Sequence, residues 1–217
     1  YDPITGKTAG RADRCRATNT CWKTFQVNSA NEYWVKAGSL LHTDTSGNDL
    51  RDPDNARFFL LSSVDHTVGG GTPGSRGVCQ QFVNTINPTP ALRALFVALD
   101  EWVTMGVRPP RSQVPRVEDD NAVFSVPQST ITGIVPQSAL GWPTIPGVTY
   151  TGVITTRYFL DFGPQFDQGI MTINPPVWQG RPRYPSFVSR VDNDGNDVAG
   201  IRLPQVEVPI GTYTGWG

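Results

Sequence analysis

The chain has 217 residues, enough for one large domain or two small ones and for a sizeable hydrophobic core. Apolar residues make up only 38%, and 22 glycines and 19 prolines indicate many turns and extended segments, short of a disordered composition. The formal net charge of −1 gives no electrostatic reason to expect binding to nucleic acid or to an acidic membrane surface. No apolar run approaches the length of a membrane-spanning helix.

The three cysteines bear on the compartment of the protein. Cys15 and Cys21 flank a short polar turn, and we expect a disulfide between them that stabilises the fold by roughly 2–3 kcal/mol. A disulfide favours an extracytoplasmic location, periplasmic or secreted, whereas three reduced thiols are the alternative. Cys79 is left over, as a free thiol or as one half of a bond to a partner outside the chain. The cysteine spacing and the two histidines predict no metal site, and no cofactor is expected.

The first regular element along the chain is expected at residues 22–28, where apolar and polar side chains alternate as in a strand. A short helix from Ser29 to about Leu41 follows. Ser29 and Glu32 have the spacing of a capping box, which is a purely structural explanation for Glu32. An acidic loop at 42–55 then leads to the next strand.

A second strand is predicted at 57–64, because this apolar run is too short for a helix and has no helical period. His66 lies just after this strand, and a loop that contains Gly69, Gly70 and Gly71 follows it. A histidine at the end of a strand beside a glycine-rich loop is a frequent position for chemistry in α/β enzymes. The structural alternative is a histidine bonded to the backbone, and we expect the glycines to form a turn.

The clearest helix is predicted at 90–105. Its apolar residues recur at the spacing of one buried helical face: Leu92, Leu95, Phe96, Leu99, Trp102 and Val103. Pro90 suits the beginning of this helix, and Gly106 suits its end.

The composition and the hydrophobic pattern of the chain change after residue 115: prolines recur, and no helical period is present. We therefore predict residues 1–115 as an α/β core and residues 116–217 as a β-rich, proline-rich extension packed on it. Extended pieces are expected at 122–126, 152–160, 187–191 and 198–208. Its aromatic residues either line a substrate cleft or attach the extension to the core, the second being favoured: Trp142, Tyr150, Tyr158, Phe159, Phe162, Phe166, Trp178 and Tyr184.

The two predicted strands bring a carboxylate and an imidazole together if they lie side by side in a parallel sheet. Glu32 and His66 then share the crevice at the carboxyl ends of the strands. A carboxylate orients an imidazole and stabilises its charged form, while the imidazole takes a proton from a nucleophile. Asp44 and Asp65 are rival partners, although adjacent side chains on a strand point to opposite faces, which disfavours Asp65. His42 is expected to be a loop residue.

The nucleophile of such a triad is missing from the chain. In the order Ser, Asp or Glu, His, the serine lies upstream in a Gly-x-Ser-x-Gly turn, and this motif does not occur in the 217 residues. The nearest match, at 74–77, has the wrong spacing and follows the histidine.

Several blocks resemble the α/β-hydrolase-domain family of large, mostly bacterial, exported hydrolase-like proteins. The blocks are Cys15–Lys23, Glu32–Trp34, Leu40–Asp44, Phe58–Gly71, Gly106–Ser112, Asp194–Pro204 and Gly211–Trp216. This resemblance covers nearly the whole chain. It implies the C-terminal part of an α/β-hydrolase fold, with the last parallel strands and a covering helix.

The resemblance implies that His66 is the base of the triad and Glu32 its acid, acting in esterase-like acyl hydrolysis of a small-molecule substrate. The serine is then expected in an upstream part of the same protein or in a companion chain. Because the chain begins with Tyr1 and shows no signal peptide, we expect a processed subunit or a fragment. The alternative function is a non-catalytic binding or assembly module in which His66 is structural.

Overall fold

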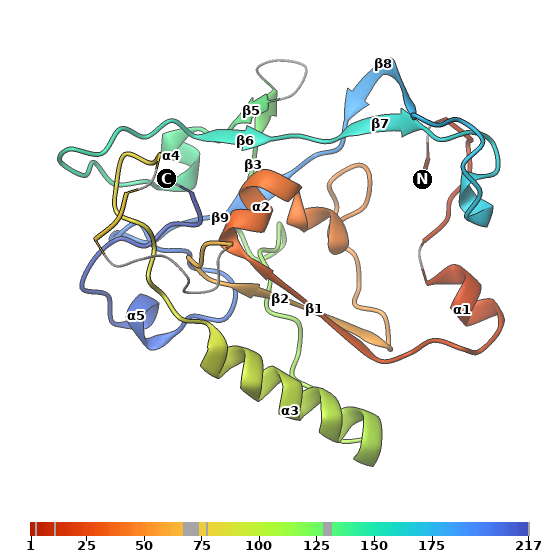
Figure 1. The fold of residues 1–217 in the computed structure, drawn as a ribbon, viewed down its shortest axis with the longest axis horizontal. Helices are drawn as coiled ribbons and strands as arrows, with labels where there is room; N and C mark the ends of the chain where they lie inside the picture. The colour runs from red at the N-terminus through yellow and green to blue at the C-terminus, as the bar shows by residue number, and fades with distance from the viewer. Residues whose placement is uncertain (3, 11, 67–73, 77, 128–131, 217) are drawn as a thin grey trace.

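The computed structural model describes the chain except residues 3, 11, 67–73, 77, 128–131 and 217. It combines helices and short strands, as expected (Figure 1). The helical segments are α1 (Asp13–Ala17), α2 (Ala30–Lys36), η1 (Gly38–Leu41), α3 (Thr89–Met105), α4 (Gln137–Leu140), η2 (Phe166–Gln168) and α5 (Pro204–Glu207). The strands are β1 (Thr24–Ser29), β2 (Ala56–Leu61), β3 (Ala122–Phe124), β4 (Val126–Pro127), β5 (Thr132–Ile134), β6 (Val153–Thr155), β7 (Tyr158–Asp161), β8 (Val177–Arg183) and β9 (Phe187–Ser189).

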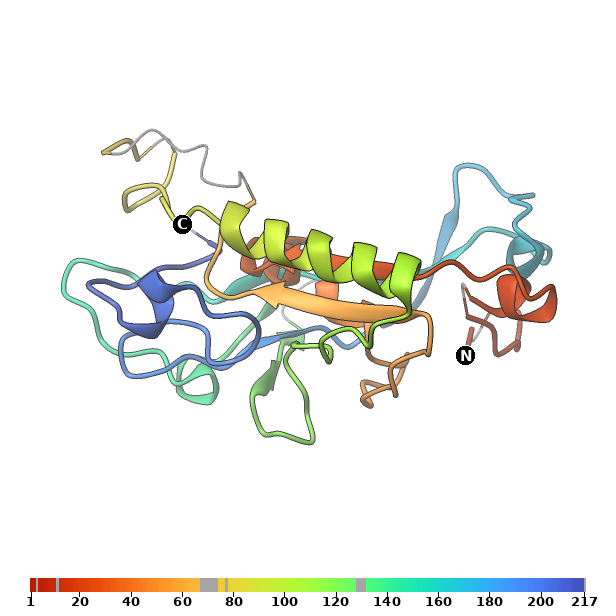
Figure 2. The same cartoon turned by 90° about the horizontal axis from the view of Figure 1, so that it is seen from below.

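The centre of the fold is the parallel pair of β1 and β2, which confirms the two strands predicted from the apolar pattern. Their register runs from Thr24 opposite Ala56 to Ser29 opposite Leu61, so both strands end at the same edge. Figure 2 shows α3 lying along one face of this pair. Trp102 of α3 stacks on Phe25 of β1 with ring centroids 5.8 Å apart, and this contact seats the helix on the strands.

Helix α2 starts at the predicted position but ends earlier than expected. The capping box between Ser29 and Glu32 is present. The helix ends at Lys36 because Ala37 adopts a left-handed conformation with φ 55°, and the chain to Leu41 continues as the 3₁₀ segment η1. A side chain at Gly38 would lie 3.1 Å from the Tyr33 ring, so the chain turns where a larger residue would be crowded.

Helix α3 confirms the helix predicted at 90–105, with Gly106 in a left-handed conformation at its end. Only part of its apolar face is covered. Leu95 and Trp102 are buried, whereas Phe96 is 74% exposed and Val103 is 54% exposed. The prediction that all six apolar residues face the core is therefore wrong for these two.

The second half of the chain consists of small antiparallel sheets. β3 pairs with β9, β4 to β6 form a three-stranded sheet, and β7 pairs with β8. The extended piece predicted at 152–160 is divided between β6 and β7. The one predicted at 198–208 is wrong, because this segment is irregular and contains α5.

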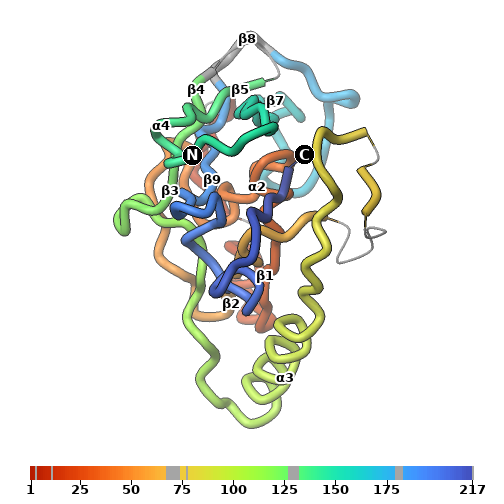
Figure 3. Tube along the Cα trace, turned by 90° about the vertical axis from the view of Figure 1, so that its left-hand side faces the viewer, coloured from red at the N-terminus to blue at the C-terminus, as the bar shows by residue number. Residues whose placement is uncertain are grey.

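The second half packs against α2 rather than standing apart from the first half. Trp142 and Tyr150 contact Trp216, and Trp216 in turn contacts Trp34 of α2. Figure 3 shows the C-terminal segment ending beside α2. A side chain at Gly215 would lie 2.3 Å from the Asn31 nitrogen, so the two backbones meet closely and require glycine there. These contacts fix the helix that carries Glu32.

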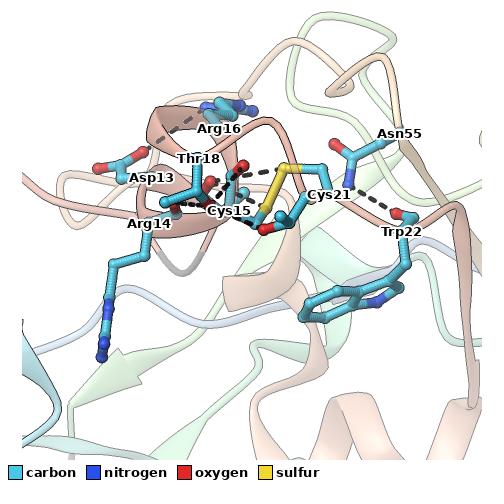
Figure 4. The surroundings of a disulfide bond; sticks show 10 residues. Asp13, Arg14, Cys15, Arg16, Thr18, Cys21, Trp22 and Asn55 are labelled. Carbon is cyan, nitrogen blue, oxygen red and sulfur yellow. Dashed lines mark hydrogen bonds and ion pairs between the residues drawn. A yellow bond between two sulfur atoms is a disulfide. The ribbon is translucent and has the colours of Figure 1, made fainter.

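The predicted disulfide between Cys15 and Cys21 is present (Figure 4). It ties α1, which buries no residue, to the start of the strand region. Asn55 donates a hydrogen bond of 2.9 Å to the Trp22 carbonyl and joins this region to the loop before β2. Among the described residues, no helix is long and apolar enough to cross a membrane.

Candidate functional site

The parallel pair brings the two predicted site residues together. Glu32 lies three residues beyond the end of β1, and His66 lies five residues beyond the end of β2. Their side chains approach to 3.9 Å between Glu32 Oε1 and His66 Nδ1. This distance is that of an ion pair and exceeds that of a direct hydrogen bond. The structure thus places Glu32 at ion-pair distance from His66.

Lys36 belongs to the same cluster, although no pattern in the sequence predicts it as a site residue. It lies one helical turn after Glu32, with its Nζ 3.6 Å from Glu32 Oε1. The same ammonium is 3.2 Å from His66 Nε2 and 3.4 Å from Nδ1. Lys36 therefore competes with His66 for Glu32. The side chain of His66 is 55% exposed, so the cluster is open to solvent.

Glu32 serves the helix cap and the histidine at the same time. Its Oε2 accepts a 2.8 Å hydrogen bond from the Ser29 backbone N–H, while Oε1 faces His66 and Lys36. The capping bond fixes the carboxylate on the first turn of α2. The structural and functional explanations of Glu32 are thus compatible, because each uses a different oxygen.

Asp44 is engaged within its own loop. It accepts 2.8 Å hydrogen bonds from the backbone N–H groups of Ser46 and Asn48 and from the Asn48 side-chain amide. These bonds explain the residue as a turn former. Asp65, the other rival of Glu32 as the acid partner of His66, stays a prediction from the sequence.

His42 is a buried core residue, not simply a loop residue as expected. It is 1% exposed, and its Nε2 is 3.0 Å from the Tyr33 hydroxyl. Burial lowers the pKa of His42 to about 4, so its imidazole is neutral near pH 7. Its Nδ1 has no hydrogen-bond partner among the described residues. These features indicate a structural role.

A buried carboxylate, Asp197, lies beneath the turn that leads to His66. Its Oδ2 accepts a 2.6 Å hydrogen bond from the Ser63 backbone N–H. Burial raises the pKa of Asp197 to about 7. Asp197 is not among the site residues predicted from the sequence. No local pattern could have identified it, since 134 residues separate Ser63 and Asp197.

A large groove lies beside the strands. It has a volume of about 1000 Å³ and is lined by the 49–57 and 108–121 segments, including Arg57, and by residues 198–200. Glu32, Lys36 and His66 are not among the residues that line it. The cluster around His66 is therefore separate from this groove.

Two further expectations concern the loop after His66. The turn at Gly69, Gly70 and Gly71 lies outside the described residues. Cys79 is a free, half-buried thiol. Within the described part of the chain, no group of histidine, cysteine and acidic residues is arranged to hold a metal ion.

Comparison with known proteins identifies a family but no individual relative. No curated protein and no solved structure is significantly similar to the chain. The model of the alpha/beta hydrolase domain family matches residues 2–217. This match agrees with the parallel strands that precede Glu32 and His66, and the chain belongs to the alpha/beta hydrolase domain family.

Proposed function

We propose that the chain contributes the base and the acid of a serine hydrolase triad that acts on carboxylic esters or related acyl compounds. His66 is the general base and Glu32 its acid partner. The observation that carries the proposal is the 3.9 Å approach of Glu32 Oε1 to His66 Nδ1 beyond two parallel strands. Membership of the hydrolase family supports the reaction class.

In the proposed mechanism, Glu32 holds the imidazole with Nδ1 protonated, so that Nε2 is free to accept a proton. Nε2 takes the proton of a serine hydroxyl as the serine attacks the acyl carbon, and later returns it to the leaving group. The charge on the carboxylate stabilises the imidazolium that forms between these steps. Lys36 Nζ lies 3.2 Å from Nε2, so the ammonium has to withdraw before a hydroxyl can take that place.

The serine is proposed to lie outside this chain, in another part of the same protein or in a companion chain. The absence of a Gly-x-Ser-x-Gly motif from the sequence supports this. Two surfaces that suit further elements of a hydrolase fold also support it. Among the described strands β1 pairs only with β2, which leaves one edge of β1 open. Helix α3 exposes four apolar side chains: Phe96, Val97, Val103 and Met105.

The disulfide between Cys15 and Cys21 supports an extracytoplasmic location, periplasmic or secreted. We propose the division into a core at 1–115 and an extension at 116–217 because prolines recur and the helical period is absent after residue 115.

A fluorophosphonate probe tests the proposal, because it labels an activated serine covalently. The probe is applied to the natively purified protein with everything that co-purifies, and the labelled peptide is identified by mass spectrometry. Labelling of a serine outside residues 1–217 that requires His66 supports the hydrolase.

The absence of any labelled serine would favour the second candidate, a non-catalytic binding or assembly module with a structural His66. The observation in favour of that candidate is the set of exposed apolar side chains on α3, which a partner could cover.

A further inference from the structure

The turn between β2 and His66 holds a residue in an unfavourable backbone conformation. Ser63 has φ 60°, in the left-handed region that residues with a side chain rarely adopt. Such a conformation is unfavourable and persists only where the surroundings hold it. Ser62 and Ser63 are 0% and 1% exposed, so the surroundings of this turn are protein rather than water.

Asp197 holds Ser63 by a reciprocal pair of hydrogen bonds. The Ser63 backbone N–H donates to Asp197 Oδ2 at 2.6 Å, and the Asp197 backbone N–H donates to Ser63 Oγ at 2.8 Å. Both residues are buried. Two bonds of opposite direction fix the position and the orientation of the Ser63 peptide, which a single bond would leave free to rotate.

The segment after Asp197 continues along the end of β2. The Ser62 hydroxyl donates to the Ala199 carbonyl at 2.6 Å, and the Ile201 N–H donates to the Leu60 carbonyl at 2.7 Å. A side chain at Gly200 would lie 2.5 Å from the Leu60 carbonyl oxygen, so the two backbones are in close contact. Asp197 therefore belongs to a segment that is hydrogen-bonded to the end of β2.

Two asparagines hold the same turn from other directions. The Asn84 side-chain amide donates to the Ser63 carbonyl at 2.5 Å and to the Thr214 carbonyl at 2.8 Å. The Asn31 backbone N–H donates to the Val64 carbonyl at 3.3 Å. Asn31 precedes Glu32, so this last bond couples the turn before His66 directly to the helix that carries the proposed acid.

We propose that Asp197 is a positioning residue for His66: by fixing the Ser63 peptide it sets where the chain leaves β2, and with it the place of the imidazole against Glu32. Asp197 does not touch the reacting atoms in this proposal. The inference rests on the proposed function of His66, and it adds a specific role for the 194–204 segment.

The electrostatics of Asp197 agree with a role as hydrogen-bond acceptor rather than as charge. Burial raises its pKa to about 7, the Ser63 N–H and Arg202 act in the opposite direction, and Asp192 adds to the rise. The neutral acid is therefore well populated near pH 7. An asparagine, which keeps an acceptor oxygen in the same place, is expected to replace it.

The test compares Asp197→Ala, Asp197→Asn and Leu140→Ala in the complete assembly that carries the serine. Leu140 is fully buried in α4, and its truncation lowers stability without touching the turn. We expect Asp197→Ala to lower kcat by about 10- to 100-fold with little change in KM, because misplacement of about 1 Å has effects of that size. Asp197→Asn is expected to keep kcat within about 3-fold, and Leu140→Ala to keep it unchanged at temperatures where it is folded.

A second readout does not depend on activity. The chain has two histidines, so the ring ¹H–¹⁵N signals of His66 and His42 are easily assigned. Asp197→Ala is expected to shift the His66 ring signals while those of His42 stay in place. Leu140→Ala should move neither. If Asp197→Ala does not fold, Ser63→Ala, which removes only the bond donated by the Asp197 N–H, takes its place with an expected 3- to 10-fold loss of kcat.

The two proposals fail in different ways. Unchanged kcat and unchanged His66 ring signals in Asp197→Ala would overturn the positioning role, even if His66→Ala is inactive. Full activity of His66→Ala would overturn the proposed function, while the shifted ring signals of Asp197→Ala would still support the positioning of the turn.

Discussion

The two histidines of this chain show how differently one side chain is used in two regions of a fold. His66 is largely exposed and lies among charged groups, with Glu32 at 3.9 Å and Lys36 at 3.2 Å. His42 is 1% exposed and faces the Tyr33 hydroxyl. The exposed ring can exchange protons with a substrate, whereas burial keeps the other neutral and fixed. The contrast predicts that His66 matters for activity and His42 for stability.

The substitution His66→Ala is the strongest test of the prediction that His66 serves activity and His42 serves stability. We expect loss of ester turnover by about 10³-fold or more in the complete assembly, because the serine loses its base. The free energy of unfolding should change by less than about 0.5 kcal/mol, since the side chain is mostly exposed. Turnover of a chromogenic ester and a urea melt measure the two effects. Equal turnover by the variant would show that His66 is structural.

Glu32 allows its two roles to be separated by paired variants. Glu32→Gln keeps an oxygen for the Ser29 N–H but loses the charge that faces His66, so we expect kcat to fall by about 10²-fold or more with stability nearly unchanged. Glu32→Ala removes both interactions and should cost about 1 kcal/mol in addition. Wild-type kcat in Glu32→Gln would assign the residue to the helix cap alone.

The pH dependence of stability tests the buried histidine. The pKa of His42 is lowered from 6.5 to about 4, so the unfolded chain binds more protons in this window, and stability is lost as the pH falls from about 6.5 to 4. The full effect is on the order of 3 kcal/mol. Asp197 acts with the opposite sign. Its pKa is raised from 3.8 to about 7, so the folded chain binds more protons, and stability is lost as the pH rises through that range.

Single variants separate these opposing contributions. In Asp197→Asn the His42 contribution remains, and between pH 4 and 6.5 stability should rise with pH more steeply than in the wild type. In His42→Gln it should rise less steeply or fall. Urea melts at several pH values measure both slopes. Identical slopes in the two variants would contradict the assignment of His42 as a buried neutral base.

Much of this arrangement was predictable because it depends on short-range patterns. The alternation at 22–28 and the apolar run at 57–64 predict the strands β1 and β2, and the spacing of Ser29 and Glu32 predicts the cap. Parallel strands end at one edge, so the approach of Glu32 to His66 follows from their order in the chain. The helical period at 90–105 identifies an apolar face but not what covers it, which is why Phe96 and Val103 proved exposed.

The rest depends on contacts between distant segments. Ser63 and Asp197 are 134 residues apart, and Asn84 joins the same turn from a third segment. The burial of His42 arises from its fit against Tyr33, and nothing in the acidic sequence around it signals that fit. The extended piece predicted at 198–208 is wrong because Arg202 binds the Asp197 and Val206 carbonyls and folds the segment on itself.

The smallest expected effect in this comparison belongs to Tyr33→Phe, which removes only the hydroxyl that faces His42. The ring stays in the core, and the loss of one buried hydrogen bond should lower the free energy of unfolding by about 1 kcal/mol. The backbone of α2 should not move, because Tyr33 packs through its ring and Glu32 keeps its bond to Ser29. Turnover should therefore stay within about 2-fold of the wild type, although Tyr33 is the residue next to Glu32. A large loss of turnover with an intact melt would mean that the buried histidine and the exposed one are coupled through α2, and the separation between the two regions would then be wrong.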